Sequence, residues 1–69
     1  MSDHQVVGKI GRVTGAIRPG RVGEVMLTVR GGSEAFLARC DGGNELPAGS
    51  RVVVVEYQPP RTVIVEAAP

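Results

Sequence analysis

Valine dominates the apolar composition of this chain. Its 69 residues include twelve valines, against three leucines and three isoleucines. Side chains branched at the β-carbon fit a pleated strand better than a helix. Glycine or proline recurs every few residues, so only residues 33–41 are free of helix breakers over a useful length, and that segment is short and alternating. The sequence therefore predicts an all-β fold made of short strands.

The length and the apolar runs limit the class of protein. A chain of this size buries only about 60% of the surface that its unfolded form exposes, so we expect one domain with a small core. The longest apolar run is 52–55, whereas a membrane-spanning helix needs about 20 apolar residues. Residues 1–5 lack the basic start and the apolar stretch of a signal peptide. We expect a domain that is cytoplasmic or faces the cytoplasm at the membrane, with no membrane span in this chain.

Cysteine and histidine are too few to form a disulfide cross-link or a structural metal site. A single cysteine cannot form an internal disulfide, and with a single histidine it falls short of the four ligands of a structural zinc site. We expect neither a metal nor another cofactor. Stability then has to come from packing, backbone pairing or oligomerisation.

Turn residues divide the chain into five predicted strands. These strands are residues 6–17, 22–30, 34–40, 51–57 and 62–66. Glycines within the first strand are typical of a bend or bulge. In the segment 18–21, Pro19 and Gly20 stand where a type II turn requires them. The connector 41–49 is expected to cross one end of the fold with one helical turn at most.

The centre of the chain predicts a hairpin with a defined register. If Gly31 and Gly32 form a two-residue turn, counting outward places Leu27 opposite Phe36, Val25 opposite Ala38 and Glu24 opposite Arg39. This register sets apolar residues against each other on one face and opposite charges on the other. Cys40 then points inward as a small buried hydrophobe.

The last two strands carry most of the remaining valines. The run 52–55 predicts either burial on both faces or a bulge that switches the inward face between Val54 and Val55. In the fifth strand we expect Val63 and Val65 to point inward.

Five strands in about sixty residues predict a small closed barrel. The favoured architecture is the oligonucleotide-binding (OB) type, with an SH3-like barrel as the alternative. The expected domain organisation is a flexible segment over 1–5, one barrel over 6–66 and a tail over 67–69.

Several short motifs resemble a known family in their order and spacing. They are Val7-Gly8-Lys9-Ile10-Gly11, Arg18-Pro19-Gly20, Gly23-Glu24-Val25, Phe36-Leu37-Ala38-Arg39, Leu46-Pro47-Ala48-Gly49, the valines 52–55 and Val63-Ile64-Val65-Glu66. Together they resemble the C-terminal soluble domain of NfeD-like proteins. The resemblance implies a five-stranded OB barrel without established catalytic residues. It also implies a role in protein interaction or membrane-protein quality control beside stomatin- or flotillin-like (SPFH) membrane proteins.

The residues themselves argue against catalysis. A nucleophile needs a neighbouring base, and the single cysteine and histidine, Cys40 and His4, lie far apart in the sequence, with His4 in the frayed terminus. The carboxylates are scattered without a repeating pair. We expect a non-catalytic domain.

Nucleic-acid binding is the rival hypothesis. Residues 1–30 carry a net charge of +3 and residues 31–69 a net charge of −2, so a basic edge is expected, with Arg12, Arg18 and Arg21 as candidate contacts for phosphate or anionic headgroups. Single-strand binders, however, stack bases on aromatic side chains, and the second and third strands offer only Phe36, which the register assigns to the core.

The remaining hypothesis is a protein-binding surface. Met26, Leu37 and Ala35 fall on the outward face of the hairpin beside Thr28, bordered by charged residues that include Arg39. A small apolar patch of this kind can mark a partner site, or another segment can cover it. Gly31-Gly32 and the fourth strand also offer edges for strand addition, which suits self-association or a docked partner strand.

Overall fold

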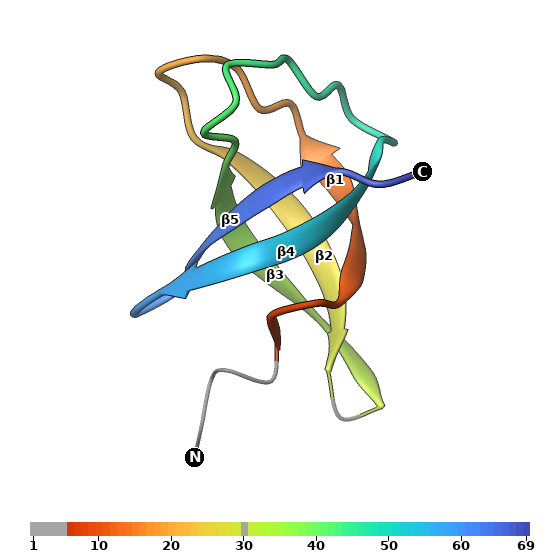
Figure 1. Ribbon diagram of the computed structural model, residues 1–69. Helices are drawn as coiled ribbons and strands as arrows, with labels where there is room; N and C mark the ends of the chain where they lie inside the picture. Colours follow the sequence, from red (N-terminus) through yellow and green to blue (C-terminus); the bar gives the residue numbers. More distant parts are fainter. Residues whose placement is uncertain (1–5, 30) are drawn as a thin grey trace.

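Five strands make up the fold (Figure 1). The structure is a computed structural model, and it describes residues 6–29 and 31–69. They are β1 (Ile10–Gly15), β2 (Gly23–Val29), β3 (Gly32–Arg39), β4 (Arg51–Gln58) and β5 (Thr62–Ala67). The strands close into one barrel in the order β1-β2-β3-β5-β4. Neighbouring strands are antiparallel except β3 and β5, which run parallel. The barrel is of the predicted OB type and not of the SH3-like alternative.

The predicted first strand is shorter than expected. Before β1 the chain turns, because the Lys9 N–H donates to the Val6 carbonyl at 3.1 Å and Gly8 has a φ of 90°. The ladder with β2 is irregular between Val13 and Gly15, and Ile17 is held by an isolated bridge to Leu46. The glycines therefore mark a turn and a bulge that divide this segment.

The predicted hairpin register is wrong by two positions. Val25 lies opposite Phe36, Leu27 opposite Glu34 and Val29 opposite Gly32. Gly32 belongs to β3, and Gly31, with a φ of 79°, precedes it. Because the shift is even, every side chain keeps its predicted face. The cross-strand pairs change, however, and the expected pairing of Glu24 with Arg39 does not form.

β4 contains the bulge that the sequence offered as one of two alternatives. The register with β5 shifts between Val54 and Glu56. Val52 and Val54 are buried before the bulge, Val55 is exposed, and Tyr57 packs against the core after it. β4 is therefore not buried along both faces. Residues 52–53 pair with both β1 and β5, so the predicted open edge is absent there, whereas residues 56–58 are paired on the β5 side alone.

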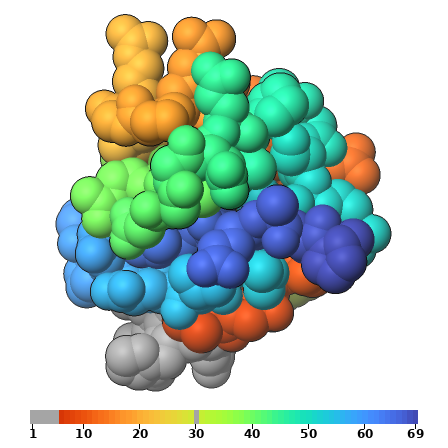
Figure 2. All heavy atoms as spheres, turned by 45° about the horizontal axis from the view of Figure 1, so that its top comes forward, coloured from red at the N-terminus to blue at the C-terminus, as the bar shows by residue number. Residues whose placement is uncertain are grey.

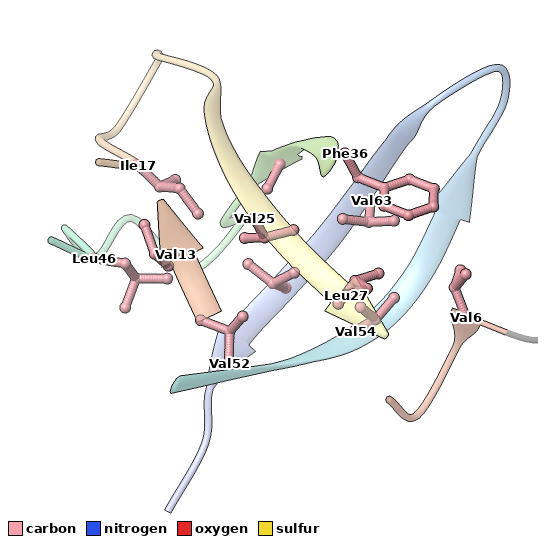
Figure 3. Packing of buried hydrophobic residues seen from close by; sticks show 12 residues of the cluster. Val6, Val13, Ile17, Val25, Leu27, Phe36, Leu46, Val52, Val54 and Val63 are labelled. Carbon is pink, nitrogen blue, oxygen red and sulfur yellow. The ribbon is translucent and has the colours of Figure 1, made fainter. Parts of the chain in front are cut away.

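The core is a column of branched side chains inside the barrel (Figure 3). Every strand contributes, and Ile17 and Leu46 close the end crossed by the connector. Val63 and Val65 are fully buried as predicted, Phe36 is buried, and Cys40 packs half-buried against the cluster. Among the described residues no polar or charged side chain is buried, so the core is held by apolar packing.

The remaining segments are connections. The connector 40–50 contains no helix and crosses the end of the barrel beside the turn 18–21 (Figure 1). Gly20 in that turn has a φ of 74°, as a type II turn requires. The Pro59–Pro60 bond is cis. β5 continues to Ala67, and the Ala68 N–H donates to the Arg51 carbonyl, so pairing extends into the residues predicted as a tail. No helix in residues 6–29 and 31–69 has the length and hydropathy that crossing a membrane requires.

Candidate functional site

Met26 and Leu37 lie on the outer face of the barrel, as the alternation in β2 and β3 predicts. Met26 is opposite Ala35 and Leu37 is opposite Glu24, so the two apolar side chains are diagonal neighbours on adjacent strands. They are 36% and 52% exposed. Thr28 is also exposed on this face. At these exposures no described segment buries the two side chains.

Ile10 adds an apolar residue that the sequence analysis did not assign. It stands two positions before Arg12, which lies opposite Met26, and it is exposed on the same side of β1. The signal was present, because Val13 points inward and Ile10 has the opposite parity. We call the four exposed or half-exposed apolar residues Ile10, Met26, Ala35 and Leu37 the outer-face patch.

Arg39, which the sequence analysis predicted to border the partner-binding surface, lies at the end of β3 and forms a contact within the barrel. Its guanidinium donates a hydrogen bond of 3.2 Å to Oε1 of Gln58 on β4. β5 runs between these two strands, and Ile64 of β5 lies next to Arg39 in the register. Ile64 is only 3% exposed although it stands on the outer face. The Arg39–Gln58 bond therefore covers the outside of β5.

Arg18 and Arg21 meet at one end of the barrel with Arg39. The three side chains surround a hollow of about 320 Å³ between the turn 18–21 and the segment that follows β3. We call this hollow the arginine pocket; the side chains that line it are Arg18, Arg21, Val22, Arg39, Cys40 and Asp41. In Figure 2 the turn, in orange, and the green segment after β3 lie side by side at this end.

Arg12 does not join Arg18 and Arg21. It lies within the β1 ladder opposite Arg51 of β4, and both side chains are exposed. In the described part of the chain neither arginine forms an ion pair. The predicted anion contacts are thus divided between the pocket at the end of the barrel and an arginine pair on its side.

The residues considered for catalysis do not assemble into a site in the part of the chain that the structure describes. Cys40 lines the arginine pocket from its half-buried position. His4 lies outside the described residues. Within residues 6–29 and 31–69, no three His, Cys, Asp or Glu side chains are placed to share a metal ion.

Comparison with known proteins identifies the family. The family model of the NfeD C-terminal domain matches residues 10–66, which span all five strands. This chain belongs to the NfeD C-terminal domain family. No curated protein sequence matches the chain.

Solved structures agree with this assignment. The soluble domain of the NfeD protein YuaF from Bacillus subtilis superposes with a TM-score of 0.83 and 23% identity, over 94% of this chain and 76% of that one. The C-terminal domain of stomatin operon partner protein 1510-C from Pyrococcus horikoshii gives a TM-score of 0.80 and 26% identity, over 100% of this chain and 97% of that one. The soluble domain of an NfeD protein and the C-terminal domain of a stomatin operon partner protein thus share this fold.

Proposed function

We propose that this NfeD C-terminal domain is a non-catalytic adaptor that binds a partner protein through the outer-face patch. The partner is a stomatin- or flotillin-like membrane protein, and the domain acts with it in membrane-protein quality control at the cytoplasmic face. The supporting observations are membership of the NfeD C-terminal domain family and the similarity of this chain to the C-terminal domain of a stomatin operon partner protein.

The outer-face patch supports binding of a protein. Its side chains stand on paired strands, so they are held in place before a partner arrives and little ordering entropy is lost on binding. Met26 and Leu37 bring apolar surface, while Thr28 and Arg39 border it with polar groups. An apolar centre with a polar rim is the usual anatomy of a protein interface.

The aromatic residues argue against the rival function, binding of single-stranded nucleic acid. Phe36 is buried in the core, and the Arg61 guanidinium lies 4.8 Å from the centre of its ring. Tyr57, on β4, packs against the same core. The outer faces of β2 and β3 therefore offer no described aromatic side chain on which a base would stack.

The test is binding of a purified stomatin-like protein to this chain, measured by isothermal titration calorimetry. The double substitution Met26→Ser, Leu37→Ser removes the two largest exposed apolar side chains of β2 and β3 and should weaken binding about tenfold or more. Val55→Ser is the matched control, because Val55 is a similarly exposed apolar residue on β4 outside the patch. Melting temperatures of all variants verify the fold.

Two outcomes would contradict the proposal. Equal loss of binding in the Val55→Ser control would show that the patch is not the contact. Micromolar binding of a single-stranded oligonucleotide with a steep salt dependence would favour the nucleic-acid function instead.

A further inference from the structure

The arginine pocket contains two arginines that face each other directly. Arg18 and Arg21 form an antiparallel bridge, in which the Arg21 N–H donates to the Arg18 carbonyl at 2.8 Å. Pro19 and Gly20 make the tight turn between them, so the two side chains start from fixed, adjacent positions. Like charges directly opposite each other on paired strands destabilise the pairing.

Only one of these two charges is compensated. Nε of Arg18 lies 3.4 Å from a carboxylate oxygen of Glu45. Within the described residues, the side chain of Arg21 makes neither an ion pair nor a hydrogen bond. Arg39 uses one nitrogen for Gln58, and a guanidinium has further N–H donors to offer.

The charges around the pocket leave a small positive excess. Arg18, Arg21 and Arg39 supply three positive charges, whereas Asp41 in the lining and Glu45, the ion-pair partner of Arg18, supply two negative ones. One positive charge therefore remains. A single monovalent anion would neutralise it and would relieve the repulsion between Arg18 and Arg21.

We propose that the arginine pocket binds a carboxylate of the partner protein, with Arg21 as the main contact and Arg39 beside it. The inference rests on the proposed function, because it takes the ligand to be a protein, and it assigns a second contact at the end of the barrel. A guanidinium matches a carboxylate in shape and can donate two parallel hydrogen bonds to it.

A carboxylate fits the pocket better than a phosphate. A phosphate monoester carries about 1.5 to 2 negative charges at neutral pH. This is nearly twice the positive excess of the arginine pocket, so Asp41 would repel the negative charge that remains unbalanced. Arg18 already pairs with the Glu45 carboxylate, so carboxylate recognition is compatible with the local geometry. Val22 and the half-buried Cys40 add apolar walls against which an aliphatic stem can pack.

The experiment titrates the isotope-labelled chain with a short peptide that contains one glutamate and has both ends blocked. Backbone amide shifts identify where it binds. We expect shifts at residues 20–22 and 39–41, and none with the matched peptide in which glutamine replaces glutamate. Inorganic phosphate at the same concentration should bind more weakly.

Two variants separate a specific contact from general charge. Arg21→Gln should weaken peptide binding about tenfold, the typical effect of one lost charge-assisted hydrogen bond. Arg51→Gln removes the same charge on the side of the barrel and should leave binding unchanged. Both side chains are exposed, and melting temperatures verify that neither variant unfolds.

Each alternative result overturns the proposal. Equal shifts with the glutamine peptide exclude carboxylate recognition, equal weakening by Arg51→Gln shows nonspecific attraction, and tighter binding of phosphate assigns a phosphate site. The titration contains no partner protein, so its failure leaves the calorimetric test of the outer-face patch unaffected. A negative result in the calorimetric test of the outer-face patch likewise leaves the titration unaffected.

Discussion

The Arg61 guanidinium donates a hydrogen bond of 2.6 Å to the backbone carbonyl of Ala35. β3 pairs with β5 only over residues 37–39, so at Ala35 the strand has a neighbour on the β2 side alone. The same guanidinium lies 3.8 Å from Glu34 and stacks over Phe36. Arg61 therefore occupies an edge carbonyl that another chain would otherwise pair with.

Substitution of Arg61 should expose this edge. Arg61→Ala is expected to lower the free energy of unfolding by about 1 kcal/mol, because the partners are half-exposed and water replaces part of the lost interaction. It should also produce a concentration-dependent dimer in sedimentation experiments. Arg12→Ala is the control, because Arg12 forms no ion pair with another described residue. A strictly monomeric Arg61→Ala chain would contradict the protective role of this contact.

Gly23 is required where β2 begins. A β-carbon at this position would lie 2.6 Å from the Ala16 carbonyl oxygen and 2.6 Å from Cγ1 of Ile17, and it would also contact the Gly15 carbonyl. We expect Gly23→Ala to destabilise the fold by about 1–3 kcal/mol, the usual cost of overpacking. In Gly32→Ala the new carbon meets nothing closer than 3.9 Å. Chemical denaturation of both variants checks the difference, and similar midpoints would show that the backbone at Gly23 moves easily.

Leu27 and Leu37 test the division between core and surface. Leu27 is fully buried, so Leu27→Ala should cost about 2–5 kcal/mol through lost transfer energy and a cavity. Leu37 is 52% exposed, and Leu37→Ala should change stability by about 0.5 kcal/mol or less. Urea unfolding followed by circular dichroism measures both. A large cost at Leu37 would mean that this side chain stabilises the barrel itself.

The opposed arginines on β1 and β4 predict a stabilising charge reversal. Arg51→Glu converts the pair with Arg12 into opposite charges and should raise the free energy of unfolding by about 0.5 kcal/mol at low salt. The gain should shrink in concentrated salt, because exposed charges are screened. Arg51→Gln, which only removes the repulsion, should give a smaller gain. If Arg51→Glu gives no larger gain than Arg51→Gln at low salt, the introduced carboxylate does not attract Arg12.

The strands and their inward faces followed from the sequence because alternation is a local property. Val25 and Leu27 alternate with Glu24 and Met26, and this pattern alone identifies the buried face. The hairpin register could not be predicted in the same way, because either glycine of Gly31-Gly32 can take a positive φ. Moving the turn by one residue shifts the register between β2 and β3 by two positions. The parity is the same for both, so the error changed the partners of Glu24 and left the core intact.

The candidate sites were predicted only in part. Met26 and Leu37 came together because they belong to one hairpin. Arg12 was grouped with Arg18 and Arg21 by proximity in the sequence, yet a bulge and a turn separate them and Arg51 arrives beside Arg12 from a distant strand. Arg39 reaches the pocket through the hairpin register, which pairs Ala38 with Gly23 just after the turn 18–21. Contacts made by barrel closure have no local signal in the sequence.

The barrel closes along two seams of three residue pairs each, where β1 meets β4 and β3 meets β5. The other pairings join strands that follow each other along the chain. Such local pairings close short loops and form fast, whereas the seams have to bring distant segments together. We therefore expect a three-stranded meander and a two-stranded hairpin to form early and to dock late. On this order of events, the two seams, one of which lies beside the arginine pocket, are the last parts of the barrel to close and the first to open.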